Sequence, residues 1–300
     1  MPSKESEAVR RHWKAARLAQ APDRETGDHA WAGLTSEPPG VDYLAVAELP
    51  ALWVVPKDAP PDRVLLCMHG GGFISGSRYS HRKLFGHLAR AVGARALVFD
   101  YRLAPEHMHP AQVEDAVAAY QWLLEQGVEA VAFCGDSCGG GLAITTQLRA
   151  RELGLPLPVA TLAISPWVDM EVSGSSYDAN RKRDAFFHRE LVRGLVDTFL
   201  GPDGDRRDPL ANPLYGKLAG FGPIYIQVGG HEVLLDDAHL LASHARSAGV
   251  DVRVDVFPEM QHTFQMAAGR APEADDAIRR LAEWVRPHLL YTGRRDDGQV

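Results

Sequence analysis

Short apolar segments alternate with segments of helical periodicity after residue 60, and this alternation limits the possible folds more than any other feature. The apolar segments are typical of buried strands: DRVLLCMH, ARALVFDY, AVAFCG, ATLAIS, PIYIQVG and VRVDVFP. Helical periodicity is found at about 81–92, 111–126, 138–152, 234–247 and 272–289. Strands separated by helices pair in parallel through right-handed crossovers, and the helices then cover both faces of the sheet. The sequence therefore predicts an α/β fold.

Two further strand-like segments, VDYLAVAEL and ALWVVP, follow one another from residue 41 with no helix between them. Strands connected this closely pair antiparallel. We therefore expect an eight-stranded, mostly parallel sheet that begins with antiparallel strands. The segment VRVDVF is expected at a sheet edge, where it could pair with a second copy of the chain in a homodimer.

One stretch, from about 167 to about 222, interrupts the alternation and is too long for a simple connection. It contains charged and aromatic residues and a helix predicted at 188–199. Near the N-terminus, residues 3–19 are predicted to form an amphipathic helix and residues 20–40 a loop. We expect one domain over 1–300, with a helical cap formed by about 1–40 and about 167–222.

Composition and charge exclude several classes of protein. A net charge of −7 gives the surface no general attraction for nucleic acid or for an anionic membrane. No segment approaches the ~20 apolar residues that a membrane span needs, and the charged N-terminus lacks the apolar core of a signal peptide. The three cysteines contain no C-x-x-C, so neither a disulfide framework nor a metal site is expected. We expect a cytoplasmic protein that needs no metal or cofactor.

The segment G-D-S-C-G at 135–139 lies between a predicted strand and a predicted helix. A turn this tight holds its central residue in a strained conformation, and Gly135 and Gly139 remove the side chains that would clash. Ser137 would then point out at the carboxyl edge of the sheet as a nucleophile. The alternatives are a serine that caps the helix and a phosphate-binding loop, but no Lys-Ser or Lys-Thr follows the glycines.

A serine nucleophile needs donors for the oxyanion and a base for its proton. The glycine loop after the strand RVLLC, His69 to Phe73, can supply backbone N–H donors. His69 precedes the serine, whereas the base of such enzymes comes last in the chain, so His69 is expected to position the loop. His262 follows the last strand and is the predicted base.

The acid that orients the base is expected directly after the strand PIYIQVG. Three carboxylates are available there, Glu232, Asp236 and Asp237. Glu232 is nearest to the end of the strand and is the predicted acid. Asp236 and Asp237 stand a turn or more into the following helix, where they could cap it or face solvent.

These motifs together resemble the hormone-sensitive-lipase-like branch of the α/β-hydrolase esterases. The resemblance covers roughly residues 40–290 and rests on H-G-G-G-F at 69–73, D-Y-R-L-A-P-E-H at 100–107, G-D-S-C-G-G at 135–140, S-P-W at 165–167, D-P-L at 208–210 and H-T-F at 262–264. It implies Ser137 as nucleophile, His262 as base and Glu232 as acid, at a position where aspartate is common. It also implies an oxyanion hole formed by the amides of Gly71, Gly72 and Cys138. Alanine is more usual than cysteine after the nucleophile.

The expected function is hydrolysis of short to medium acyl esters through an acyl-enzyme intermediate. A lactone of the terpenoid type is the alternative substrate, and a small-molecule receptor is the alternative outside the enzymes. Apolar residues of the predicted cap and glycine loop are candidates for the substrate pocket: Phe73, Trp167, Phe186 and Phe187. Asp100 and Arg102 are expected to pair with each other and to hold the loop after their strand.

Overall fold

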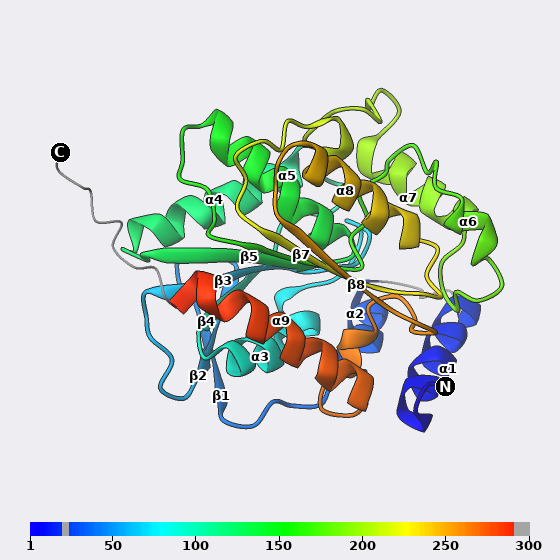
Figure 1. Cartoon of the computed structure of the whole chain (residues 1–300), viewed down its shortest axis with the longest axis horizontal. Helices are drawn as coiled ribbons and strands as arrows, with labels where there is room; N and C mark the ends of the chain where they lie inside the picture. The colour runs from blue at the N-terminus through cyan, green and yellow to red at the C-terminus, as the bar shows by residue number, and fades with distance from the viewer. Residues whose placement is uncertain (20–23, 291–300) are drawn as a thin grey trace.

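An eight-stranded sheet runs through the centre of the molecule (Figure 1). The computed structural model describes residues 1–19 and 24–290. The strand order is β1-β2-β4-β3-β5-β6-β7-β8. The strands are β1 Val41–Ala45, β2 Ala51–Pro56, β3 Arg63–Met68, β4 Arg95–Phe99, β5 Ala130–Asp136, β6 Thr161–Ile164, β7 Ile224–Gly229 and β8 Val252–Phe257.

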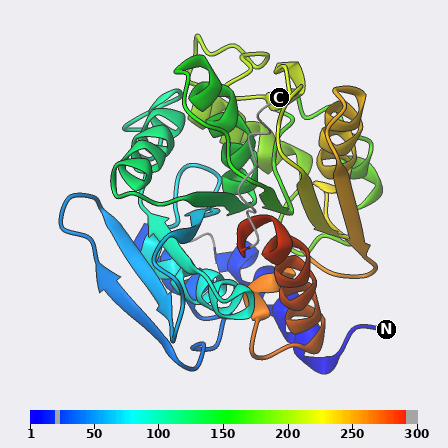
Figure 2. The same cartoon turned by 60° about the vertical axis from the view of Figure 1, so that its left-hand side comes forward.

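The pairing confirms the predicted topology. β1 pairs antiparallel with β2, and β2 pairs antiparallel with β4. All the other neighbours in the sheet are parallel. β8, which contains the segment VRVDVF, lies at the edge opposite β1, as expected (Figure 2).

Helices cover both faces of the sheet, with α3 and α9 on one face and α4, α5 and α8 on the other (Figures 1 and 2). Side chains that alternate along β3 belong to different apolar clusters. Leu65 and Cys67 pack with residues of α3 and α9, whereas Leu66 and Met68 pack with residues of α4 and α5. The helices are α1 Lys4–Ala19, α2 Arg24–Ala32, α3 Arg78–Val92, α4 Ala111–Glu125, α5 Cys138–Glu152, α6 Ser176–Ala179, α7 Arg189–Leu200, α8 Leu235–Ser247 and α9 Pro272–Leu290, with short 3-10 helices η1 Pro213–Tyr215 and η2 Phe264–Ala267.

The prediction of a loop over 20–40 is wrong for residues 24–32, which form α2. Trp31 of this helix is buried, and its ring lies 4.5 Å from the ring of Trp13 and 5.6 Å from that of His81, measured between centroids. Packing against other elements therefore stabilises a segment that has little helical periodicity of its own. Residues 20–23 lie outside the described part of the chain.

The segment between β6 and β7 contains α6, α7 and η1. It contacts the N-terminal helix, because the ring of Phe186 lies 5.3 Å from that of Trp13 in α1. Two parts of the chain that are far apart in sequence thus meet at this side of the sheet. Within residues 1–19 and 24–290, none of the helices is both long enough and apolar enough to span a membrane.

Candidate active site

Ser137 lies on the tight turn between β5 and α5 with φ 55° and ψ −125°, a strained conformation for a residue with a side chain. A Cβ on Gly135 would lie 2.1 Å from the carbonyl oxygen of Gly139, and one on Gly139 would lie 2.1 Å from that of Met68. Glycine is therefore required at both positions. The Ser137 side chain makes no capping hydrogen bond to α5, which argues against the capping alternative.

Ser137, His262 and Glu232 form a line of two hydrogen bonds. Ser137 Oγ lies 3.0 Å from His262 Nε2, and His262 Nδ1 lies 2.7 Å from Glu232 Oε2. A carboxylate can only accept, so Nδ1 carries the proton and Nε2 is free to accept the serine hydroxyl. The three side chains are almost completely buried, with 3%, 2% and 0% of their surface exposed.

Glu232 is held by further hydrogen bonds on its other oxygen. Oε1 accepts the hydroxyl of Ser165 at 2.6 Å and the amide of Gly229 at 2.5 Å. Ser165 also accepts the amide of Thr263, the residue after His262, at 3.2 Å. Sequence reasoning gave no role to Ser165, although it begins the motif S-P-W.

The two other candidate acids hold the loop after β6 and do not reach His262. Asp236 accepts the hydroxyl of Ser175 and the amide of Ser176. Asp237 is fully buried and accepts the amides of Val168 and Asp169. Among the three carboxylates, only Glu232 is hydrogen-bonded to the histidine.

The environment of His262 favours its charged form. Burial by itself would lower the pKa of this imidazole. The charge of Glu232 and its hydrogen bond outweigh burial, with smaller contributions from the charges of Asp184 and Asp136, so the pKa of His262 lies above its ordinary value. A base of this kind can take the serine proton and hold it as an imidazolium.

The glycine loop that follows β3 lies beside the nucleophile. Gly71 and Gly72 have φ of 122° and 63°, and a Cβ on Gly71 would lie 2.2 Å from the carbonyl oxygen of Ser75. The amides on either side have protein partners, because Gly70 N donates to Asp136 Oδ1 at 3.0 Å and Phe73 N donates to Cys138 Sγ at 3.3 Å. These contacts fix the loop whose central amides are the predicted oxyanion donors.

His69 is buried at the start of this loop. Its Nδ1 lies 2.8 Å from the carbonyl oxygen of Gly70, and its ring stacks on Tyr101 at 4.2 Å between centroids. Burial, helped by the nearby His81, lowers the pKa of His69 to about 3. A neutral histidine in this place supports the loop and does not serve as a base.

The four candidate pocket residues fall into two groups. Phe187 packs edge-on against His262 at 4.7 Å, and Phe186 packs against Phe187 at the same distance. Phe73 lies 5.9 Å from Trp167, on the side of the glycine loop. Phe73, Trp167 and Phe187 are buried, so they belong to the apolar packing around the site.

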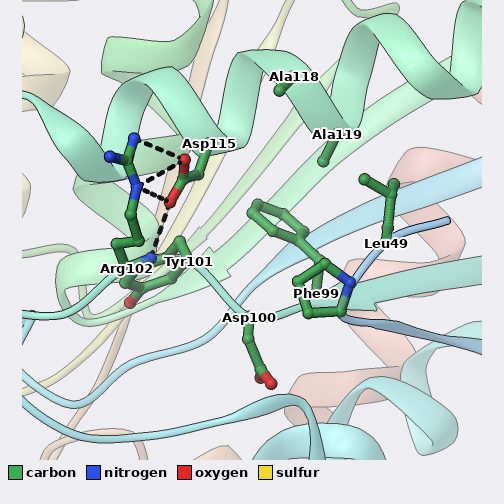
Figure 3. A pocket seen from close by; sticks show the side chains of 9 residues that line it. Leu49, Phe99, Asp100, Tyr101, Arg102, Asp115, Ala118 and Ala119 are labelled. Carbon is green, nitrogen blue, oxygen red and sulfur yellow. Dashed lines mark hydrogen bonds and ion pairs between the residues drawn. The ribbon is translucent and has the colours of Figure 1, made fainter.

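The expected pair between Asp100 and Arg102 does not form. Arg102 pairs with Asp115 of α4 at 2.8 Å, and Asp100 pairs with Arg78 of α3 at 2.7 Å, so the two side chains point apart (Figure 3). Residues two positions apart in a regular strand point to the same side, but Asp100 and Arg102 follow the end of β4 in irregular backbone. Each side chain pairs with a different helix. Both residues line a cavity of about 400 Å³ that also includes Tyr101 but none of Ser137, His262 and Glu232.

Within the described ranges, no three His, Cys, Asp or Glu side chains are grouped as metal ligands. The cysteines Cys67, Cys134 and Cys138 are buried and unpaired.

Comparison with known proteins gives close relatives over nearly the whole chain. A family model described as alpha/beta hydrolase fold matches residues 65–266. The acetyl-hydrolase of Streptomyces hygroscopicus is 39% identical over 294 residues, which cover 95% of this chain and 97% of that protein. An esterase from the bacterial hormone-sensitive lipase family, solved by crystallography, is 39% identical with a TM-score of 0.90 and covers 96% of this chain and 99% of its own. The esterase EstE5, in a crystal soaked with p-nitrophenyl butyrate, is 32% identical with a TM-score of 0.88. The match covers 96% of this chain and 99% of the EstE5 chain.

Proposed function

Because the chain belongs to the α/β-hydrolase family, in its bacterial hormone-sensitive-lipase branch, and is a carboxylesterase, we propose that Ser137, His262 and Glu232 are its catalytic triad. The observation that carries this proposal is the buried line of hydrogen bonds from Ser137 Oγ through His262 to Glu232. The order of the three side chains and the distances between them support the roles of nucleophile, base and orienting acid.

The reaction proceeds in two halves. Ser137 Oγ attacks the ester carbonyl carbon while His262 Nε2 takes the hydroxyl proton, and Glu232 stabilises the imidazolium that forms. The tetrahedral intermediate collapses, the alcohol leaves with the proton from His262, and the acyl group stays on Ser137. Water then attacks the acyl-enzyme while His262 Nε2 takes its proton, and His262 returns that proton to Ser137 Oγ as the carboxylic acid is released.

We also propose that the amides of Gly71, Gly72 and Cys138 bind the oxyanion of both tetrahedral intermediates. The position of Cys138 at the first turn of α5 supports this role, because N–H groups at a helix N-terminus have no partner within the helix. The hydrogen bonds of Gly70 and Phe73 hold the loop before the substrate arrives. Loss of one oxyanion donor lowers the rate on the order of 10²–10³-fold.

The substrates proposed are short acyl esters, with acetyl esters first. The relative named acetyl-hydrolase, and EstE5 with its p-nitrophenyl butyrate soak, support this choice. The lactone alternative is not favoured, since the relatives are esterases.

Hydrolysis of p-nitrophenyl esters from acetate to palmitate tests both parts of the proposal. Ser137→Ala is expected to fall to background, and Glu232→Gln to fall by up to ~10⁴-fold in kcat. Asp236→Asn is the matched control, because it removes a carboxylate one turn further along that does not contact His262. Full activity of Ser137→Ala would contradict the triad, and a maximum at palmitate would contradict the proposed substrates.

Two segments, about 1–40 and about 167–222, are proposed to form a cap over the site within one domain. The contact between Trp13 and Phe186 supports this grouping, since it joins the two segments. The contact of Phe187 with His262 brings the second segment to the site. Limited proteolysis with and without a covalent serine inhibitor tests the cap, because inhibitor should protect both segments together.

The exposed edge of β8 is the proposed contact of a homodimer. This strand has a neighbour on one side only, and Val256 on it is 40% exposed. An edge of this kind can pair with the same edge of a second copy. A monomer mass by light scattering at working concentration would reject the dimer.

Cytoplasmic localisation is proposed from the cysteines. All three are buried and unpaired, as is usual for proteins of a reducing compartment. Cell fractionation with the full chain tests this proposal, and recovery in the periplasmic or culture fraction would contradict it.

A further inference from the structure

Three buried polar side chains join the segment 180–187 to the loops that carry Glu232 and His262. They are Asn180, Asp184 and Gln261, with 3%, 4% and 4% of their surface exposed. We call these three residues the polar clamp. None of them was singled out from the sequence as a site residue.

Asp184 stands at the centre of the polar clamp. One carboxylate oxygen accepts the amides of Phe186 at 2.9 Å and Phe187 at 2.8 Å. The other oxygen accepts the amide of Val233, the residue after Glu232, at 2.9 Å. The buried carboxylate of Asp184 therefore fixes both the backbone of Phe186 and Phe187 and the loop that carries Glu232.

The other two residues tie the same segment to both loops. Asn180 Nδ2 donates to the carbonyl oxygens of Gly230 at 3.1 Å and Glu232 at 2.8 Å. Gln261, the neighbour of His262, accepts the amide of Ala185 at 2.8 Å and donates to the carbonyl oxygen of Arg183 at 3.1 Å. Buried backbone groups that lose such partners are costly, so the segment and the two loops are held as one unit.

Phe187 brings this unit into contact with the proposed base, His262. The ring of Phe187 lies edge-on to the imidazole of His262 with 4.7 Å between centroids and 80° between planes. A shift of the backbone at 186–187 would remove this contact from one face of His262. A shift of the backbone at 233 would move Glu232 relative to Nδ1.

On this basis, we propose that Asp184 is a positioning residue of the esterase reaction, which sets His262 and Glu232 relative to Ser137 from within the cap. The inference rests on the proposed triad and extends it to a residue that touches neither substrate nor Ser137. It acts through the backbone of Phe187 and Val233.

The negative charge of Asp184 allows a second measurement. A residue with a purely structural role would not change the pH dependence of the reaction. The charges of three carboxylates favour the charged form of His262: Glu232 after β7, Asp184 in the segment 180–187, and Asp136 at the end of β5. Burial raises the pKa of Asp184, while the amides of Val233, Phe186 and Phe187 and the charge of His262 oppose that rise. Removal of the Asp184 charge therefore lowers the pKa of His262.

Asp184→Asn is the first variant to measure, with p-nitrophenyl acetate between pH 5 and 9. An amide has the same shape but cannot accept on both sides, so it loses the bond from Val233 or those from Phe186 and Phe187. We expect kcat to fall roughly 10- to 100-fold with KM nearly unchanged, because small displacements of a catalytic group cost this much. The acid limb of kcat/KM should move to lower pH, since a neutral base survives to lower pH.

Asp169→Asn is the matched control. Asp169 is a buried carboxylate in the same region, but its oxygens accept, among the described residues, from Glu171 and Ser173 of its own loop. The Asp169→Asn variant should lose thermal stability, but the acid limb of its kcat/KM profile should lie at the same pH as in the wild type. If Asp169→Asn moves the limb as far as Asp184→Asn does, the assignment is overturned.

Gln261→Met provides a second test should Asp184→Asn not fold. Methionine is similar in size and removes the bonds to Arg183 and Ala185 without removing a charge. The expected result is a lower kcat with an unmoved acid limb, and a wild-type kcat would overturn the inference. Wild-type kcat and pH profile in Asp184→Asn would overturn it directly, whereas failure of the triad itself would be seen separately as activity in Ser137→Ala.

Discussion

The amide of Phe73 donates a hydrogen bond to the thiol sulfur of Cys138 across 3.3 Å, which joins the glycine loop to the helix of the nucleophile. The sulfur also lies 3.6 Å from the hydroxyl of Tyr101, whose proton goes to the carbonyl oxygen of His69 at 2.7 Å. Cys138 thus holds the loop with its side chain, in addition to the backbone N–H proposed for the oxyanion. An alanine could supply the N–H but not the acceptor.

Cys138→Ala is therefore expected to weaken the loop. The buried amide of Phe73 loses its partner, which costs about 1–3 kcal/mol of unfolding free energy. The value of kcat should fall with it, because the loop carries two proposed oxyanion donors. Cys138→Ser should recover most of both, since a hydroxyl can accept from the same amide. Urea unfolding and kcat with p-nitrophenyl acetate measure the two effects, and equal values for alanine and serine would contradict a role for the sulfur.

The thiols of the native enzyme are expected to resist alkylation. Burial raises the pKa of Cys138 to about 12, and the side chain has no exposed surface. Reaction needs the thiolate and access to it, and both are lacking. Mass spectrometry after N-ethylmaleimide treatment at pH 7.5 should show no adduct and full activity, with three adducts after unfolding in urea. Rapid labelling of Cys138 in the native enzyme would disprove this, and labelled enzyme should be inactive because the adduct fills the space beside the oxyanion site.

The sheet could be predicted from the sequence because each strand is a short apolar run with helices before and after it. The position of Ser137 followed from Gly135 and Gly139, which permit the close approach that a strand-to-helix turn requires. By contrast, α2 was missed because its buried residue Trp31 packs on partners far away in the sequence. A local pattern does not contain such a contact.

The supporting residues of the site could not be predicted for the same reason. Asp184 bonds to Val233 and Ser165 bonds to Glu232, and no spacing rule relates positions 49 and 67 residues apart. Asp184 lies in the stretch that was predicted only as part of a cap, and its carboxylate is buried against three amides. Asp100 and Arg102 show the opposite error, where nearness in sequence suggested a pair that the fold does not form.

Alanine at position 72 is expected to be tolerated only when the side chain of Leu195 in α7 is shortened or displaced. The φ of 63° at Gly72 is accessible to alanine at a cost of about 1–2 kcal/mol, but the added Cβ would lie 3.1 Å from both δ carbons of Leu195. Gly72→Ala should therefore lower kcat/KM roughly tenfold or more, and Leu195→Ala in the same chain should restore part of it. A double-mutant cycle measures this coupling.

Gly71→Ala is the control for that cycle. Its Cβ would meet the backbone of Ser75 at 2.2 Å, at a φ of 122° that side chains rarely adopt. Leu195→Ala should give no recovery in this case. If truncation of Leu195 helps both alanine variants equally, the contact with Gly72 is not the cause.

The activity is expected to rise with pH through the pKa of His262, because only the neutral imidazole can take the serine proton. The charge of Glu232, its hydrogen bond and the nearby carboxylates raise this pKa against the effect of burial, so the midpoint should lie above the ordinary value of about 6.5. In Glu232→Gln the imidazolium loses its main stabilising charge, and the midpoint should move to lower pH. Profiles of kcat/KM from pH 5 to 9 test this, and an unmoved midpoint would show that Glu232 does not control the base.

Asp237 should make the folded protein more stable at mildly acid pH than at neutral pH. Burial, reinforced by the charge of Asp169, raises its pKa from 3.8 to about 7. Between those values the folded state keeps a proton that the unfolded state releases, so the unfolding free energy falls as pH rises through this window. Each unit of raised pKa is worth about 1.4 kcal/mol, which gives a total on the order of a few kcal/mol.

Asp237→Asn should remove this dependence, because the amide can accept from Val168 and Asp169 with its oxygen and donate to the hydroxyl of Tyr177, which lies 3.0 Å from Oδ1. The variant should therefore gain stability relative to wild type as pH rises from 4 to 8, as measured by urea unfolding at several pH values. Asp236→Asn is the control, since hydrogen bonds from Ser175 and Ser176 outweigh burial and lower the pKa of Asp236, so its contribution is constant above pH 5. A difference between wild type and Asp237→Asn that does not change with pH would mean that Asp237 is already ionised in the folded protein at pH 4.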